Sequence, residues 1–421
     1  MDHILHLKCL VCGDTYLPGD IDYICPKHGN EGIVDVCYDY DLIKTRISRE
    51  SLAVNPDFSI WRYKPLLPVA PEAPVPPLAI GWTPMYAAPR LAGRLGLGHV
   101  FVKDDGRLPT ASFKDRASAV AVVRARAEKA PVITTASTGN AAAALSGICA
   151  SVGQKNVIFV PRSAPPAKIA QLLVYDATVI LVKGTYDDAF ELCLEAAAEY
   201  GWYNRNTGYN PYMTEGKKTA AFEICEQMHW QAPDVVFVSV GDGCIIGGLH
   251  KGFKDLLALG FIDSMPRIIG VQAEGSSYLY EAWKNKEDIL TKPPVSGVTV
   301  ADSISAGLPR DRIKALAAVT KTDGAYVQVS DEEILAAVPE LARGVGVFAE
   351  PAGACAYAGL VKAVEQGLVA ADERIVVLNT GNGLKDIQST MKAVEMVGSK
   401  ASLIAPDLEE LKKIMINLEK P

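Results

Sequence analysis

From about residue 80 onward, short runs of apolar and β-branched residues alternate with longer runs rich in alanine. The apolar runs are nearly continuous, which is typical of strands covered on both faces of a parallel sheet. The expected strands are 99–103, 132–135, 157–160, 178–182, 235–238, 267–271 and 375–378. The runs between them predict helices at 117–129, 141–152, 187–200, 216–228 and 247–259.

This order of elements predicts an α/β protein built from parallel βαβ units. Ligands of such folds bind outside the carboxyl ends of the strands, where the helices begin. We therefore expect functional residues at the junctions between strands and helices.

The pattern differs at both ends of the chain. Residues 1–45 read as a separate small unit, in which Cys9-Leu-Val-Cys12 is followed by Cys25-Pro-Lys-His28. Residues 64–77 are rich in proline, which fixes φ and removes hydrogen-bond donors, so an extended linker is expected there. The segment after Ala405, rich in Glu, Lys and Leu, predicts one surface helix.

Composition narrows the class of protein. The net charge of −7 argues against a nucleic-acid partner. No run approaches the ~18–20 apolar residues of a membrane span, and the N-terminus lacks signal-peptide features, so a cytoplasmic protein without a membrane partner is expected. Five of the nine cysteines stand among apolar or small residues and are expected to be reduced core residues: Cys149, Cys193, Cys225, Cys244 and Cys355.

The first motif whose residues could take part in a reaction is Thr110-Ala-Ser-Phe-Lys-Asp-Arg116. It lies after an expected strand and before a long expected helix. Lys114 there is either a solvated first-turn lysine or a lysine pressed between small and aromatic neighbours. In the second case burial and the positive helix end disfavour its protonated form, so the amine is available as a nucleophile. Asp115 and Arg116 are equally well explained as ordinary helix charges.

Three further motifs follow strands. Residues 135–140 suit a carboxylate at a helix start, although a plain N-cap explains the same residues. Residues 238–248 read G-x-G-x-x-x-G, one residue away from the dinucleotide pattern, so a single phosphate is the expected ligand. In residues 377–386, Thr380 is either a cap or a hydroxyl aimed at a ligand.

Together, S-F-K-D-R, S-T-G-N, the glycine-rich loop and T-G-N-G-L-K-D resemble the fold-type II enzymes that use pyridoxal 5′-phosphate (PLP), and within them the threonine synthase family. The resemblance spans roughly residues 80–395 and includes matches at 210–219 and at Glu350-Pro-Ala-Gly-Ala354. It implies two three-layer αβα domains with mostly parallel sheets, as in tryptophan synthase β, behind a zinc-ribbon-like unit. The implied limits are 1–45 for the ribbon, 46–112 with 226–421 for the large PLP-binding domain, and 113–225 for the small substrate-binding domain.

The resemblance also implies a role for each matching residue. Lys114 would carry PLP as a Schiff base and move protons between substrate carbons. Asn140 would bond the phenolic oxygen of PLP, and Thr380 would face its pyridine nitrogen, where a hydroxyl favours elimination and replacement over transamination. The substrate carboxylate would be held by Ser137, Thr138 and Gly139, and the cofactor phosphate by Gly241, Asp242, Gly243, Cys244 and Ile245.

The substrate implied by the family is O-phosphohomoserine, which loses phosphate and gains water to give threonine. The chain departs from the family pattern at Ala141, Gly208 and Met213, where partners of the substrate phosphate are missing. Candidate replacements are Arg205, Asn206, Lys217 and Lys218. The departures favour the alternatives, a cysteate synthase acting on O-phosphoserine and sulfite or an ammonia-lyase of the threonine or diaminopropionate kind. The spread of motifs favours threonine synthase.

Some relatives carry a cysteine-rich ribbon, and the spacing of Cys9, Cys12, Cys25 and His28 matches a tetrahedral zinc site. Cys37 is an alternative to His28, and a ribbon that has lost its metal is the alternative to a zinc site. The resemblance implies a small, phosphorylated amino-acid substrate as the partner, and relatives are commonly homodimers. A non-catalytic binding module is the remaining hypothesis, and the intact Lys114 motif speaks against it.

Overall fold

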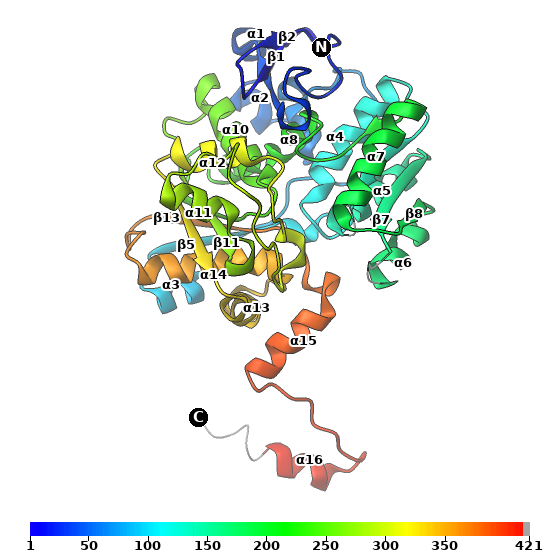
Figure 1. Ribbon diagram of the computed structural model, residues 1–421. Coiled ribbons are helices and arrows are strands. Elements are labelled where there is room, and N and C mark those ends of the chain that lie inside the picture. Colours follow the sequence, from blue (N-terminus) through cyan, green and yellow to red (C-terminus); the bar gives the residue numbers. More distant parts are fainter. Residues whose placement is uncertain (138, 163, 165, 416–421) are drawn as a thin grey trace.

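The computed structural model describes residues 1–137, 139–162, 164 and 166–415. Three sheets organise this part of the chain, and Figure 1 shows the N-terminal unit lying over two larger α/β units. The N-terminal sheet has the order β2-β1-β3, the large sheet β12-β11-β10-β13-β5-β4, and the small sheet β8-β7-β6-β9. The α/β class expected from the sequence is therefore confirmed.

The large sheet is parallel except for β4, which pairs antiparallel with β5. Its strands are β4 (Met85–Ala87), β5 (His99–Asp104), β10 (Val235–Ser239), β11 (Arg267–Ala273), β12 (Ala325–Val329) and β13 (Arg374–Asn379). Alternate residues of β10 enter two different cores, with Val235 and Phe237 in one and Val236 and Val238 in the other. Both faces of the sheet are therefore buried, which explains why the run is apolar throughout.

Helices cover both faces of the large sheet. One face packs against α3 and α14, which α13 covers in turn, and the other packs against α10 and α12. The helices of this unit are α3 (Pro89–Leu95), α10 (Cys244–Leu259), α11 (Tyr278–Asn285), α12 (Arg312–Thr320), α13 (Asp331–Val345), α14 (Pro351–Glu365), α15 (Ile387–Met396) and α16 (Leu408–Met415). The expected tail helix is α16, and Figure 1 shows it lying away from the rest of the molecule, whereas α15 packs against α13.

The small sheet is entirely parallel. It contains β6 (Ile133–Ala136), β7 (Asn156–Pro161), β8 (Thr178–Val182) and β9 (Tyr203–Asn204), with α4 (Lys114–Ala127), α5 (Asn140–Ser151), α6 (Pro166–Val174), α7 (Tyr186–Tyr200), α8 (Tyr212–Lys217) and α9 (Thr219–Gln227) around it. The expectation that every apolar strand is covered on both faces is wrong for β8. It is an edge strand, and its Ile180 and Leu181 are 38% and 50% exposed because α7 packs over β6 and β7.

The N-terminal unit is an antiparallel sheet of β1 (Ile4–Cys9), β2 (Thr15–Tyr16) and β3 (Val34–Tyr38), followed by α1 (Tyr40–Lys44) and α2 (Arg49–Ala53). It is anchored to the catalytic part by polar contacts. The Tyr38 hydroxyl donates to Glu215 at 2.6 Å, and Lys251 Nζ donates to the carbonyl of Val36 at 2.7 Å.

The proline-rich connector is packed, contrary to the expectation of an extended linker. A 3-10 helix, η2 (Ile60–Leu66), enters the connector, and Leu66, Leu67 and Val69 are buried. His3 donates to the carbonyl of Leu67, and Arg124 donates to the carbonyl of Pro68. The apolar residues between the prolines outweigh the proline signal, because burying them stabilises the packed conformation.

The five cysteines expected in the core are all buried and free, as predicted. Among the described residues, no helix combines the length and apolar character that crossing a membrane requires. The domain limits expected from the sequence stay a prediction.

Candidate active site

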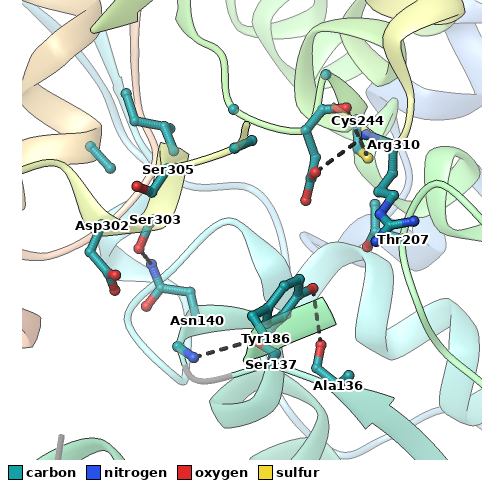
Figure 2. A pocket seen from close by; sticks show the side chains of 18 of the residues that line it. Ala136, Ser137, Asn140, Tyr186, Thr207, Cys244, Asp302, Ser303, Ser305 and Arg310 are labelled. Carbon is teal, nitrogen blue, oxygen red and sulfur yellow. Dashed lines mark hydrogen bonds between the residues drawn. The ribbon is translucent and has the colours of Figure 1, made fainter. Parts of the chain in front are cut away.

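One cavity of about 820 Å³ lies where connections of the large and the small sheet meet, and Figure 2 shows part of its lining. Every expected PLP or substrate residue that the structure describes lines it: Lys114, Ser137, Gly139, Asn140, Gly241, Asp242, Gly243, Cys244, Ile245 and Thr380. Thr138 lies outside the described residues. The strand ends come together because parallel strands present their carboxyl ends at one edge of a sheet.

Lys114 is the first residue of α4 and is half-buried. Its Nζ has no hydrogen-bond partner among the residues that the structure describes. Burial lowers the pKa of Lys114, the nearby Arg205 acts in the same direction, and Glu350 opposes both. The result is an amine that loses its proton more easily than a surface lysine, as a nucleophile requires.

The residues around Lys114 hold it in place. The backbone N–H of Phe113 donates to the carbonyl of Thr380 at 2.9 Å, which ties the start of α4 to the end of β13. Asp115 accepts from the backbone N–H of Thr110 at 2.8 Å and is fully buried. The interpretation of Asp115 as an ordinary helix charge is therefore wrong, since its carboxylate closes the turn that precedes the lysine.

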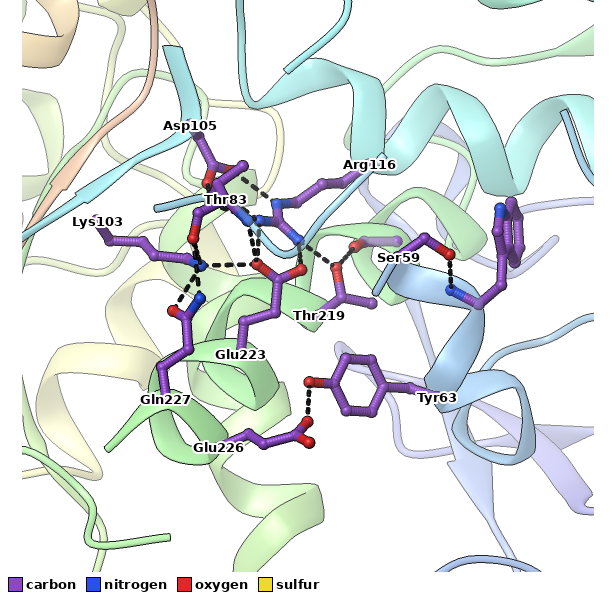
Figure 3. A network of polar contacts seen from close by, with 12 residues as sticks. Ser59, Tyr63, Thr83, Lys103, Asp105, Arg116, Thr219, Glu223, Glu226 and Gln227 are labelled. Atoms are coloured by element: carbon purple, nitrogen blue, oxygen red, sulfur yellow. Dashed lines mark hydrogen bonds and ion pairs between the residues drawn. The ribbon is translucent and has the colours of Figure 1, made fainter. Parts of the chain in front are cut away.

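Arg116 is likewise fully buried, in the network of Figure 3. Its guanidinium donates to Asp105 at 2.6 Å and to both oxygens of Glu223, at 2.5 and 2.8 Å. Lys103 Nζ also donates to Glu223, at 2.7 Å. Although burial works against it, the two cations hold the pKa of Glu223 at about 2. The network joins β5, α4 and α9 within the first turn of the helix that Lys114 begins, so Arg116 is not an ordinary surface charge either.

The loop between β10 and α10 has room for a ligand and no room for side chains at its glycines. Gly243 has φ of +86°, and a Cβ there would lie 2.6 Å from the Cβ of Ala315. A Cβ on Gly241 would lie 2.7 Å from the Cα of Ile304. The loop leads into the N-terminus of a long helix, whose first N–H groups have no partner within the helix. This arrangement fits a phosphate group.

Asn140 begins α5 and contacts the opposite unit. Its Nδ2 donates to Glu350 Oε1 at 2.7 Å and to the Ser303 hydroxyl at 3.2 Å. Burial raises the pKa of Glu350, while Lys114 opposes that shift. Glu350 stands in the motif Glu350-Pro-Ala-Gly-Ala354, and the sequence alone assigns no role to its carboxylate. Its place at the start of α14 was the available signal, because helix starts line ligand sites in this class of fold.

Ser137 and Thr380 occupy neighbouring connections of the same cavity. Ser137 Oγ accepts from the backbone N–H of Gly139 at 3.2 Å. Thr380 is 5% exposed and follows Asn379, whose Nδ2 donates to Asp104 Oδ1 at 2.7 Å. The threonine therefore stands on a strand end that is fixed to the neighbouring strand β5.

The three departures from the family pattern lie in different places. Ala141 lines the cavity, whereas Met213 is fully buried and is absent from the described lining. Gly208 has φ of +76°, and a Cβ there would lie 2.5 Å from the Cβ of Arg310, which also lines the cavity. Arg310 thus fills space that a side chain at position 208 would need.

The ligand atoms of Cys9, Cys12, Cys25 and His28 lie within 4.8 Å of one another. Cys12 Sγ and Cys25 Sγ are 3.9 Å apart, close to the ~3.8 Å expected for two sulfurs on one tetrahedral zinc ion. His28 Nε2 is buried without a hydrogen-bond partner in the described part of the chain. These residues fit a zinc ion. Cys37 is not in the group that the described residues form, so the geometry favours His28 as the fourth ligand.

A family model described as "Pyridoxal-phosphate dependent enzyme" matches residues 77–381. The chain belongs to this family. It is 40% identical to the threonine synthase of Methanocaldococcus jannaschii over 98% of this chain and 99% of that protein. It is 39% identical to the threonine synthase of Methanosarcina acetivorans over 93% and 94%, and 38% identical to that of Synechocystis over 84% and 91%. The resemblance inferred from the motifs is confirmed, and PLP is the cofactor of the family.

Solved structures with this fold include a threonine deaminase of Solanum lycopersicum, with a TM-score of 0.65 and 22% identity over 92% of this chain and 99% of that one. Diaminopropionate ammonia lyase of Escherichia coli has a TM-score of 0.65 and 19% identity over 82% and 94%. At these identities the likeness concerns the fold alone, and it confirms the expected fold-type II architecture.

Proposed function

We propose that this PLP-dependent lyase is a threonine synthase, which converts O-phosphohomoserine and water into threonine and phosphate. The observation that carries the proposal is the 40% identity to a threonine synthase along nearly the whole of both chains. The cavity adds chemical support, since a lysine with a lowered pKa and a glycine-rich loop both line it.

The proposal assigns the residues of the cavity to PLP and to the substrate. The amides of Gly241, Asp242, Gly243, Cys244 and Ile245 would hold the cofactor phosphate, with Asn140 and Thr380 at the ring and Lys114 as the attachment point. Bound in this way, PLP withdraws electrons from the carbons of the substrate and makes their protons acidic. Ser137, Thr138 and Gly139 would hold the substrate carboxylate.

Lys114 moves protons between the substrate carbons. Its Nζ accepts a proton when neutral and returns it when charged, which requires a pKa close to the working pH. Burial lowers the pKa of Lys114 toward that range. Glu350 moderates the effect, because its carboxylate favours the charged amine.

Two ion pairs link the small unit to the large unit, each with at least one residue in the cavity lining, and they would help to close the cavity against water. Arg310 Nη2 donates to Asp187 of α7 at 2.8 Å, and Lys168 of α6 pairs with Asp302. Each pair joins the small unit to the segment between α11 and α12 of the large unit. A closed cavity protects reactive species from hydrolysis.

The proposal extends to the remaining expectations. Cys9, Cys12, Cys25 and His28 bind a structural zinc ion, and the chain works as a homodimer in the cytoplasm. Its domains have the limits 1–45, 46–112 with 226–421, and 113–225. Support for the zinc ion comes from the four converging ligand atoms.

A second candidate function is favoured by Ala141, which lines the cavity where the family pattern has a hydroxyl. A cysteate synthase or an ammonia-lyase would not need that hydroxyl. The deciding experiment measures phosphate and threonine formed from O-phospho-L-homoserine by the PLP-loaded protein. Formation of both is expected. Absence of turnover with the visible spectrum of the cofactor intact would contradict the proposal, and O-phosphoserine with sulfite would then be assayed.

A further inference from the structure

Two buried cations, one lining the cavity and one hydrogen-bonded to a lining residue, have no ion-pair partner among the described residues. Arg205 follows β9 and is 1% exposed, and Lys217 ends α8 and is fully buried. Neither forms an ion pair with a carboxylate in the part of the chain that the structure describes. Removing a charge from water costs several kcal/mol by rough estimate, so a fold keeps such groups when another ion compensates them.

The neighbouring Lys218 shows how this fold otherwise treats a buried lysine. Its Nζ contacts Glu215 at 2.6 Å and Asp255 at 2.7 Å. Because both carboxylates occupy its amine, Lys218 is not available to bind the substrate. Asn206 is also occupied, since its Oδ1 accepts from the Thr135 hydroxyl and from the N–H of Ala136, both at 2.9 Å.

Arg205 has one donor group left over. Its Nε donates to the Ser118 hydroxyl at 3.1 Å and its Nη1 to the Thr207 hydroxyl at 2.9 Å. Nη2 is buried and has no partner among the described residues. Arg205 and Thr207 both line the cavity, so an anion that entered it would be within reach of this group.

Thr207 connects the two cations, because both donate a hydrogen bond to its hydroxyl. Its Oγ1 accepts from Arg205 and also from Lys217 Nζ, at 3.4 Å. A hydroxyl has two acceptor sites and one proton, so with both sites taken it has a proton to donate. Figure 2 shows Thr207 close to Arg310. Arg310 can lie there because Gly208 has no side chain to occupy the same space.

We propose that Arg205, Thr207 and Lys217 form the site for the phosphate of the substrate, in place of the partners missing at Ala141 and Met213. This inference rests on the proposed function. The cofactor phosphate has its own donors in the amides of residues 241–245. The substrate phosphate has the greater need of full positive charges, because it takes the electron pair when the bond between carbon and oxygen breaks.

The lowered pKa values of Lys217 and Arg205 are consistent with an anion-binding site that holds no anion. Burial lowers the pKa of Lys217 to about 8, and Arg205 and Lys114 act in the same direction, while Cys244 and the carboxylate of Asp311 oppose them. Burial also lowers the pKa of Arg205 to about 10. A bound phosphate would favour the charged form of both groups.

The test compares Arg205→Met, Lys217→Met and the milder Thr207→Val with Lys254→Met, which removes an exposed charge from α10. The holoenzyme is titrated with inorganic phosphate as a competitive inhibitor, and the KM for O-phospho-L-homoserine is measured. Loss of a charged hydrogen bond corresponds to about 10- to 100-fold weaker binding. We expect both constants to rise by that factor in the Arg205 and Lys217 variants, by less in Thr207→Val, and by nothing in Lys254→Met.

Two further measurements separate the sources of the phosphate. The dissociation constant of PLP from each variant and the binding of phosphate-free L-homoserine to the holoenzyme are both expected to stay within about threefold of wild type, a factor worth less than 1 kcal/mol. Weaker PLP binding with unchanged inhibition by phosphate would overturn the inference and assign the cations to the cofactor. Melting temperatures identify a variant that is merely unfolded, in which case Thr207→Val decides.

The outcomes for this site and for the proposed function are distinguishable. If wild type turns over O-phospho-L-homoserine and the variants keep its KM and inhibition constant, the site is refuted and the function stands. If wild type does not turn it over but binds inorganic phosphate through Arg205, the function fails, and the anion site then serves another phosphorylated amino acid.

Discussion

Lys114 combines a lowered pKa with an amine that has no hydrogen-bond partner among the described residues, and its role is the most direct to test. Lys114→Ala removes the attachment point for PLP and the base that moves protons. We expect turnover to fall by at least about 10³-fold, as for loss of a nucleophile that also acts as a base. The visible absorbance of the bound cofactor is expected to disappear, while the circular dichroism of the fold is retained. Product formed at the wild-type rate would contradict the mechanism.

Thr380 carries a second prediction at the scale of one residue. A carboxylate beside the pyridine nitrogen would favour its protonated form and strengthen electron withdrawal. We therefore expect Thr380→Asp to raise the proportion of keto-acid product from transamination relative to elimination, measured by chromatography, with Thr380→Ser as the matched control. If the product ratio and the spectrum of the cofactor stay as in wild type, Thr380 does not face that nitrogen.

His3 gives a prediction about pH. Its Nε2 donates to the carbonyl of Leu67 at 2.8 Å, and burial lowers its pKa below 6.5. The unfolded chain then binds more protons at acid pH than the folded chain, so the contribution of His3 to stability is lost as the pH falls through about 6.5. The melting temperature of wild type should drop more between pH 7.5 and pH 5.5 than that of His3→Gln, which keeps a donor without a titrating ring. Equal drops would contradict the assignment.

At the scale of elements, the start of α4 depends on charges that come from β5 and α9. Glu223→Gln leaves Arg116 and Lys103 in the interior with one carboxylate fewer. Breaking a buried ion pair costs about 3–5 kcal/mol of unfolding free energy. We expect that loss in urea unfolding of the holoenzyme, compared with no more than about 0.5 kcal/mol for Glu365→Gln at an exposed site of α14. A Glu223 variant as stable as the control would show that the network does not stabilise the fold.

The strands show what pattern reasoning can recover. The runs that became β5, β10, β11 and β13 were recognised because burial on both faces makes them apolar throughout. The short strands β4 and β9 have too few residues for a pattern, and they exist because neighbouring strands pair with them. The prediction of an extended linker at 64–77 is wrong, because the buried Leu66 and Leu67 hold the proline-rich segment against the fold.

Some residues of the candidate site can likewise be predicted from the sequence, and others cannot. Residues on strand-to-helix junctions, such as Lys114 and Thr380, were found because the fold class dictates where junctions meet. The role of Glu350 was not found, because its contact with Asn140 joins positions 210 residues apart. The sequence offers four candidates for binding the substrate phosphate. Arg205 and Lys217 remain because the structure shows that Asn206 and Lys218 already have other partners.

At the scale of the whole molecule, the N-terminal unit is bonded to the part of the chain that carries Arg205 and Lys217. The hydroxyl of Tyr23 accepts from the N–H of Asn204 at 3.2 Å, and Tyr38 donates to Glu215. We expect about one zinc ion per chain by atomic absorption, and a melting temperature that falls when a strong chelator removes it. Cys12→Ser should lose the zinc, whereas Cys37→Ser should keep it. Zinc retained in the first variant or lost in the second would contradict the ligand set.

The edge strand β8 also has a consequence for the behaviour of the protein in solution. Its backbone donors and acceptors are open on one side, and Ile180 and Leu181 face the solvent beside them. An open, apolar edge of this kind is a template onto which a strand from another chain can add. In concentrated solution, we therefore expect the rim of the small sheet to be one place where two copies of the chain associate.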